Sequence, residues 1–225
     1  MKVETHTISY MRQKDLFDPI KQRFKIIVLG TGAIGSFVTL NLAKLGFNDI
    51  LVYDYDKVES YNIPNQFFKI SDIGKFKVDA LKETVKEFAD VDIETEKKKV
   101  TKNTEFPVGL NNLFILAFDT LRERKKIFNK LKEIRNCYVM DIRVGGEEYN
   151  IQTINLFKDE EIKEWEKSFN IIPAELSCSA KSICYTNLSV TAEVCNIVKK
   201  LNNNEKYPTR LIRHMKSYRI INNQK

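Results

Sequence analysis

The pattern of apolar and polar positions predicts strands and helices in regular succession from residue 24 onward. An apolar run over 24–30 ends in glycine, helical apolar spacing covers 34–46, and a second apolar run covers 50–54. A strand, a helix and a strand within this length are typical of a right-handed crossover between parallel strands. The start of the chain therefore predicts a parallel sheet covered by helices.

Further elements continue the succession, with strands expected at 91–95, 113–119 and 138–143 and helices at 72–89, capped by Ser71, and 121–134. From 148 the residues alternate between apolar and polar, which is typical of strands that expose one face. Helical spacing then returns over 159–169 and 179–201, and 207–221 is expected to form a hairpin or an edge strand. We therefore expect a Rossmann-like, doubly wound α/β fold whose mainly parallel sheet is extended by antiparallel C-terminal strands.

The length of 225 residues is enough for one domain with its own core. We expect a single domain over 1–225. It would comprise a polar arm (1–23), a nucleotide-binding part (24–145) and a C-terminal part with extra strands, a helix and a basic end (146–225).

The net charge of +7 belongs to the C-terminal end of the chain. Residues 199–225 contain Glu205 as their one acidic residue among many lysines and arginines, so the preceding residues are neutral overall. A basic end of this kind is either a solvated edge or a surface for an acidic partner. Because the charge lies outside the motifs described below, nucleic acid is not expected as a partner.

Several classes of protein are excluded by the composition. No apolar run is long enough to cross a membrane, and the N-terminus lacks the apolar segment of a signal peptide, so we expect a cytoplasmic protein. The four cysteines form no Cys-x-x-Cys pair, and buried, reduced thiols are expected. The two histidines, His6 and His214, lie near the ends, which makes a Ser-His-Asp hydrolase hard to build.

The segment 30–35 (GTGAIG) lies between an expected strand and an expected helix. Gly30 permits a tight turn, Gly32 and Ala33 let a phosphate or ribose approach the backbone, and Gly35 lets helix and strand pack closely. Asp54 closes the next strand, where a carboxylate accepts hydrogen bonds from ribose hydroxyls, and Asp56 follows on the same face. These features predict a nucleotide site without choosing among NAD, FAD, S-adenosylmethionine and ATP.

The loop after Asp54 narrows that choice through a resemblance. In chain order the relevant segments are 10–13 (YMRQ), 54–66 (DYDKVESYNIPNQ), 72–78 (DIGKFKV), 118–120 (FDT) and 142–147 (IRVGGE). In this order and spacing they resemble the adenylating domain of ThiF, MoeB and ubiquitin-activating enzymes. The resemblance covers nearly the whole chain.

The resemblance implies adenylation by ATP, with Mg²⁺, of the C-terminal carboxylate of a small protein or peptide. Lys77 then corresponds to the phosphate-binding lysine, Asp119 to the acid that holds magnesium, and Arg12 to an arginine that reaches the triphosphate of a neighbouring subunit. A homodimer is implied by the role of Arg12. Asn62 and Gln66 would donate amide hydrogen bonds to phosphates or fix the loop, and Asn65 is also expected among the nucleotide-binding residues.

The sequence departs from the family in ways that leave alternatives open. The family usually has arginine where this chain has Asn65, so a triphosphate contact is either lost or supplied by Lys57, Lys69 or Lys75. Cys178 and Cys184 are either packing thiols or acceptors of the activated acyl group. An NAD-dependent oxidoreductase and a catalytically degenerate nucleotide-binding module remain the alternative functions.

Overall fold

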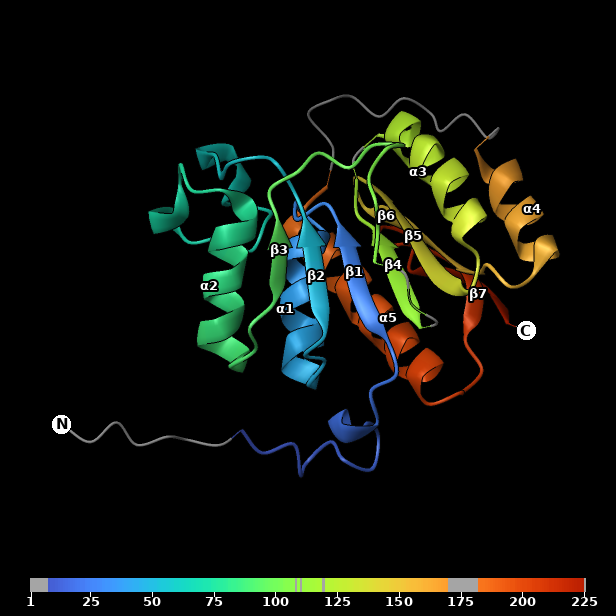
Figure 1. The fold of residues 1–225 in the computed structure, drawn as a ribbon, viewed down its shortest axis with the longest axis horizontal. Helices are drawn as coiled ribbons and strands as arrows, with labels where there is room; N and C mark the ends of the chain where they lie inside the picture. Colours follow the sequence, from blue (N-terminus) through green and yellow to red (C-terminus); the bar gives the residue numbers. More distant parts are fainter. Residues whose placement is uncertain (1–7, 108, 110, 119, 170–181, 225) are drawn as a thin grey trace.

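The computed structural model describes residues 8–107, 109, 111–118, 120–169 and 182–224. Within them, one eight-stranded sheet has the order β3-β2-β1-β4-β5-β6-β7-β8. Its strands, shown in Figure 1, are β1 (Lys25–Leu29), β2 (Ile50–Tyr53), β3 (Glu94–Glu96), β4 (Asn112–Leu116), β5 (Cys137–Gly145), β6 (Glu148–Asn155), β7 (Pro208–His214) and β8 (Arg219–Gln224). The strands β3-β2-β1-β4-β5 pair in parallel and the last three pair antiparallel. The expected Rossmann-like sheet with an antiparallel extension is confirmed.

The order of the parallel strands reverses between β1 and β4, which therefore end next to each other. Ala117, just after β4, donates its N–H to the carbonyl oxygen of Leu29 at 2.9 Å. Doubly wound sheets bind ligands at the carboxyl ends of their strands beside such a reversal. This edge lies at the top of Figure 1.

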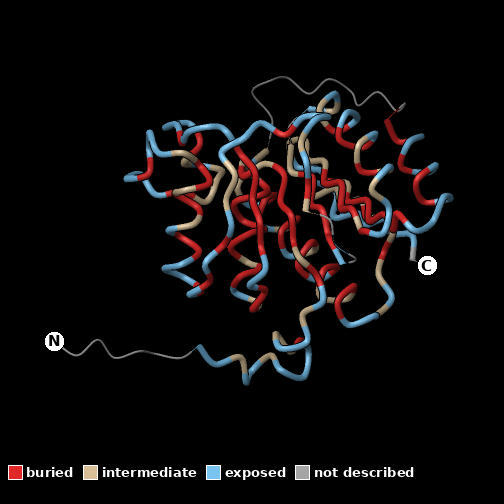
Figure 2. Tube along the Cα trace, in the orientation of Figure 1, coloured by how far each residue is buried: buried red, intermediate tan, exposed pale blue. Residues whose placement is uncertain are grey.

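Two hydrophobic cores lie on the two faces of the sheet. The helices α1 (Gly35–Leu45), α2 (Lys77–Ala89) and α5 (Cys184–Asn202) cover one face, and α3 (Leu121–Ile134) and α4 (Asp159–Ser168) cover the other. The central strands are buried on both sides, as the burial tube shows (Figure 2). This double burial explains their uninterrupted apolar runs.

The predicted elements are present, but the strand expected at 91–95 forms only over Glu94–Glu96, and the start of α2 is wrong. The helix begins at Lys77 rather than 72, and Ser71 is exposed within a short 3-10 turn, Ile70–Asp72, instead of capping the helix. The intervening residues pair with the loop after β2, where the N–H of Val58 donates to the carbonyl of Lys75 at 2.9 Å. Backbone pairing therefore overrides helical apolar spacing over 72–76.

The two ends of the chain lie away from the carboxyl edge of β1. The arm contains a 3-10 turn, Pro19–Lys21, and packs at the C-terminal end of α1 (Figure 1). The basic end forms the β7–β8 hairpin, with β8 at the outer edge of the sheet and Lys216 and Arg219 exposed. In the described part of the chain no helix is long and apolar enough to cross a membrane.

Candidate nucleotide site

The glycine loop connects β1 to α1 at the carboxyl edge. Gly30 has a φ of 95°, a left-handed conformation that disfavours a side chain. A Cβ on Gly35 would lie 1.9 Å from the carbonyl oxygen of Gly30, so only glycine allows this approach of helix to strand. A Cβ on Gly32 would meet nothing nearer than Gln66 Nε2, at 3.9 Å. The fold therefore requires Gly30 and Gly35, whereas Gly32 leaves open space beside the loop.

The N-terminus of α1 faces this open space. No side chain caps the helix, and Gly32 and Ala33 before it are half-buried. Ser36 fixes the first turn, because its Oγ donates to the carbonyl of Gly32 at 2.7 Å and accepts the N–H of Phe67 at 3.0 Å. An uncapped helix N-terminus next to free volume favours an anion such as phosphate.

Asp54 organises the loop from the end of β2. Its Oδ2 accepts the backbone N–H of Thr31 at 2.7 Å and the Thr31 hydroxyl at 3.0 Å, and its Oδ1 accepts the N–H of Asp56 at 2.9 Å. A carboxylate oxygen has two acceptor positions, so Oδ1 retains one of them. The predicted contact of Asp54 with a ribose hydroxyl would use this position.

Asp56 holds Lys77 at the same edge. The Lys77 ammonium lies 3.1 Å from Asp56 Oδ2, and the Lys77 N–H donates to the carbonyl of Asp56 at 2.9 Å. The lysine side chain is 8% exposed and the aspartate side chain 48%, so the pair is open on the aspartate side. Because an ammonium has three N–H donors, Lys77 can hold Asp56 and also donate to a phosphate.

The loop between β2 and α2 is fixed on both sides. Asn62 is buried, and its Oδ1 accepts the N–H of Glu59 at 2.9 Å. On the other side, Nδ2 of Asn187, from the first turns of α5, donates to the carbonyl of Asn65 at 2.9 Å. Asn62 therefore shapes the loop through its oxygen, and Asn187 is a site neighbour that the sequence analysis missed.

Buried amide oxygens near this loop lack donors. In the described residues, Asn65 Oδ1, Gln66 Oε1 and Asn187 Oδ1 are buried without a hydrogen-bond partner. Buried polar atoms are nearly always paired with protein, water or ligand. A nucleotide supplies suitable donors, and with the open space at Gly32 and the cation of Lys77 these atoms fit such a ligand.

The three lysines considered as substitutes for the missing arginine are engaged elsewhere. Lys69 pairs with Glu87, and Lys75 lies 2.6 Å from Glu83, both of them carboxylates of α2. The Lys57 ammonium lies 5.3 Å from the ring centroid of Phe76. None of these contacts leads toward Gly32.

Arg12 lies at the opposite end of α1 from the glycine loop of its own chain. Gln13 beside it donates from Nε2 to the carbonyl of Leu45 at 2.7 Å, at the C-terminal end of the helix. The helix is about 16 Å long at 1.5 Å per residue. Arg12 is exposed and is not brought together with Lys77 within one chain.

Asp119 and Cys178 lie outside the described residues. Cys184 is half-buried at the first position of α5. Burial raises the pKa of Cys137 and of Cys195 to about 12, so both are inert packing thiols. Among the described residues, no group of three or more His, Cys, Asp or Glu side chains could hold a metal ion.

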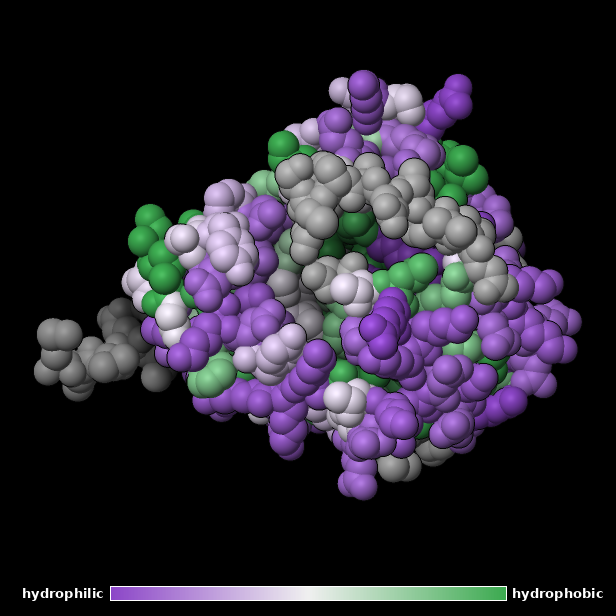
Figure 3. Space-filling view, turned by 90° about the horizontal axis from the view of Figure 1, so that it is seen from above, coloured by the Kyte–Doolittle hydropathy of each residue, from purple (hydrophilic) through white to green (hydrophobic). Residues whose placement is uncertain are grey.

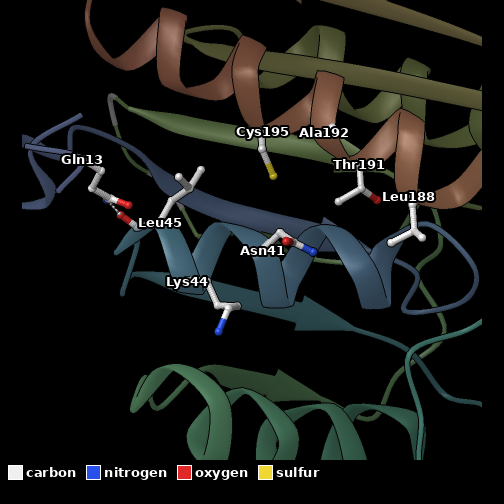
Figure 4. A pocket seen from close by; sticks show the side chains of 8 residues that line it. All are labelled: Gln13, Asn41, Lys44, Leu45, Leu188, Thr191, Ala192 and Cys195. Atoms are coloured by element: carbon white, nitrogen blue, oxygen red, sulfur yellow. Dashed lines mark hydrogen bonds between the residues drawn. The ribbon is translucent and has the colours of Figure 1, made fainter. Parts of the chain in front are cut away.

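A cavity of about 340 Å³ lies elsewhere, between α1 and α5 (Figure 4). Its lining residues are Gln13, Asn41, Lys44, Leu45, Leu188, Thr191, Ala192 and Cys195. Aliphatic side chains and amides dominate this set, which contains no carboxylate. Figure 3 looks down on the carboxyl edge of the sheet, where hydrophilic side chains predominate and hydrophobic side chains lie near the middle and at parts of the rim.

A buried ionic network that the sequence analysis missed lies beside the end of β4. Arg124 of α3 donates from Nη1 to the carbonyl of Leu116 at 3.0 Å and also binds Asp141 Oδ1 and the carbonyl of Phe118. Asp141 Oδ2 accepts Nη2 of Arg143 at 2.7 Å and Nε1 of Trp165 at 2.9 Å. Charged residues are nearly always exposed unless paired, so only the three-dimensional pairing explains this burial.

The network makes a prediction for acid stability. Burial disfavours the charged Asp141 carboxylate, but Arg124 and Arg143 outweigh it and hold its pKa below the ordinary value of 3.8. Its contribution to stability is therefore present above that pH and is lost as the pH falls through the lower folded pKa. We expect Asp141→Asn to lower the free energy of unfolding at neutral pH by about 3 kcal/mol. In urea unfolding at several pH values, the free energy of unfolding of this variant should also fall less steeply with decreasing pH than that of the wild type. Equally steep declines would contradict this prediction.

Comparison with known proteins finds similarity in the part of the chain that contains the glycine loop and Lys77. The sequence profile described as the ThiF family matches residues 8–135. The NEDD8-activating enzyme E1 catalytic subunit of Arabidopsis thaliana is 30% identical over 138 residues, which are 60% of this chain and 28% of that protein. The chain thus spans about a quarter of the length of the curated relatives it matches.

Solved structures share the fold over most of the chain. PaaA matches with a TM-score of 0.69 and 19% identity, over 92% of this chain and 74% of its own. E. coli MccB with ATP matches with a TM-score of 0.67 and 19% identity, over 92% and 64%. MccB with AMPCPP and MccA matches with a TM-score of 0.66 and 18% identity, over 91% and 65%.

Proposed function

The chain belongs to the ThiF family, and from this membership we propose that it uses ATP to adenylate the C-terminal carboxylate of a small protein or peptide. The observation that carries the proposal is Lys77, a buried ammonium at the carboxyl edge that is joined to the glycine loop through Asp56, Asp54 and Thr31. Solved structures of E. coli MccB with ATP, and with AMPCPP and MccA, support a nucleotide and a second chain as ligands of this fold.

In the proposed reaction the carboxylate of the substrate attacks the α-phosphorus of ATP. An oxygen–phosphorus bond forms, the bond from the α-phosphorus to the oxygen that bridges to the β-phosphorus breaks, and pyrophosphate leaves. A C-terminal carboxyl group is ionised at neutral pH, so the attack needs no general base. The chain's task is to stabilise charge on the phosphate oxygens.

The described residues supply that stabilisation. Lys77 donates N–H groups to phosphate oxygens, and the uncapped N-terminus of α1 adds a partial positive charge. Asp54 holds the ribose, while Asn65 Oδ1 and Gln66 Oε1, which have no partner within the protein, accept hydrogen bonds from the nucleotide. Mg²⁺, when bound, neutralises phosphate charge, and Asp119 is the residue proposed to hold it.

We further propose a homodimer in which Arg12 serves the site of the second copy. Its position at the far end of α1 supports this, because it is remote from the glycine loop of its own chain. Large apolar side chains are exposed on the arm and on α5: Met11 (78%), Leu16 (69%), Tyr185 (44%) and Leu188 (50%). Leu188 also lines the cavity of Figure 4 together with Gln13 of the arm, and these exposed apolar groups support an interface on this side.

The dimer predicts complementation between two inactive variants. Arg12→Ala and Lys77→Ala should each be inactive alone, and a mixture equilibrated at equal concentration should regain about a quarter of wild-type exchange activity, because half of randomly mixed dimers contain one complete site. The measurement is ATP–pyrophosphate exchange before and after equilibration. Activity that stays at the level of the separate variants would exclude a site completed by Arg12 of a second copy.

Protection against thermal unfolding tests the nucleotide itself. ATP with Mg²⁺ should add RT ln(1 + [L]/Kd) to the free energy of unfolding and thereby raise the Tm, whereas NADH should not. Protection by NADH alone would favour the oxidoreductase. Protection by ATP without pyrophosphate exchange for any candidate peptide would favour a degenerate module.

For the step after adenylation we propose that the acyl-adenylate is transferred directly to a partner and that no thioester forms on Cys178 or Cys184.

A further inference from the structure

We infer that Arg124 is a positioning residue for the nucleotide site: from α3, it fixes the end of β4 against the glycine loop. The inference concerns the site of the proposed function and rests on it for its catalytic consequence. Its structural part, the placement of the loop by Arg124, is independent of the ligand.

The first step is the hold of Arg124 on β4. The side chain is 5% exposed, and its guanidinium donates to the carbonyl of Leu116 at 3.0 Å and to the carbonyl of Phe118. These carbonyls flank Ala117. A planar guanidinium presents several N–H donors in a fixed geometry, so it can hold both carbonyls at a set separation.

The second step leads from Ala117 to the glycine loop. The N–H of Ala117 donates to the carbonyl of Leu29 at 2.9 Å, and a Cβ on Gly30 would lie 3.1 Å from the carbonyl oxygen of Ala117. Gly30 in turn lies directly under Gly35 and the start of α1. A shift of Ala117 therefore displaces the turn that carries Gly32.

The third step is the anchorage of the guanidinium. Asp141, fully buried on β5, binds Arg124 through Oδ1 and Arg143 through Oδ2. Arg143 contacts no carbonyl of β4 in the described structure; it donates instead to the carbonyl of Ser168 at 3.1 Å and to its hydroxyl at 2.8 Å. Two arginines thus share one carboxylate, and only one of them holds the strand beside the glycine loop.

This arrangement supplies a matched pair of variants, Arg124→Lys and Arg143→Lys. Lysine keeps a positive charge beside Asp141, but it lacks the planar guanidinium that holds two carbonyl groups at once. Without nucleotide, amide hydrogen exchange of Gly30 and Ala117 should become about tenfold faster in R124K and change less than twofold in R143K, which should instead loosen residues 165–169. Equal effects of the two variants on Gly30, or no effect of R124K, would overturn the inference.

Enzymatic assay of the same pair separates this inference from the proposed function. In ATP–pyrophosphate exchange, R124K should lower kcat/KM for ATP about tenfold relative to R143K at equal Tm. If the wild type does not use ATP, the proposed function fails, and the exchange of Gly30 and Ala117 still decides the positioning role. If R124K does not fold, native-state exchange of the wild type in low urea replaces it. The amides of Gly30, Ala117 and Arg124 should then open as one unit, and separate opening of Gly30 would overturn the inference.

Discussion

Lys77→Ala is expected to reduce ATP–pyrophosphate exchange by about two to three orders of magnitude, as removal of one preorganised donor to a developing charge does. Lys77 is a buried cation at the carboxyl edge, and its ion pair with Asp56 links it to the glycine loop. The lysines considered as substitutes contact Glu87, Glu83 or Phe76 instead. None of these three lysines therefore takes over its role.

The fold should tolerate this substitution. The Asp56 side chain left behind is 48% exposed, so water can solvate the carboxylate. The Lys77 N–H bond to the carbonyl of Asp56 belongs to the backbone and remains. Lys75→Ala is the matched control, because Lys75 lies two residues earlier and pairs with exposed Glu83. Wild-type exchange in K77A, or equal losses in K77A and K75A, would contradict the assignment of Lys77.

Gly35→Ala is expected to destabilise the fold by about 3 kcal/mol, at the upper end of the usual cost of overpacking. The added Cβ would lie 1.9 Å from the carbonyl oxygen of Gly30, and that atom belongs to the backbone, so relief requires α1 to move off β1. Urea unfolding measures the loss, and the nucleotide's thermal protection should disappear with it.

Gly32→Ala separates binding from folding at the same loop. Its Cβ would meet only Gln66 Nε2 at 3.9 Å, so the free energy of unfolding should change by less than about 1 kcal/mol. The methyl group would nevertheless occupy the space left for the phosphates, and thermal protection by ATP should fall sharply. Equal destabilisation by both substitutions would show that the two glycines have the same role.

Local signals account for the part of the molecule that was predicted correctly. The glycine spacing between an apolar strand and a helical segment identifies the loop, and Gly46 ends α1 as expected, with a φ of 105°. The helix after β4 was predicted at its observed bounds, Leu121–Ile134, and in the structure Thr120 caps its N-terminus. These features depend on neighbours in sequence.

Features that depend on distant neighbours were missed. Asn187 contacts Asn65, which lies 122 positions away, and no residue near either one in sequence indicates that bond. In the sequence, Arg124 looks like an exposed residue of a helix, and only the structure places Asp141 of β5 beside it. The prediction of where α2 begins was wrong for the same reason, because Lys75 pairs with Val58 across the loop.

The placement of Arg12 at the remote end of α1 has a consequence for how the protein behaves in dilute solution. If each site is completed by an arginine from a second molecule, a single chain is only part of an enzyme. Activity per chain then depends on how many chains are paired, so it should fall on dilution toward the dissociation constant of the dimer. The concentration of the protein would thus set its catalytic activity per chain.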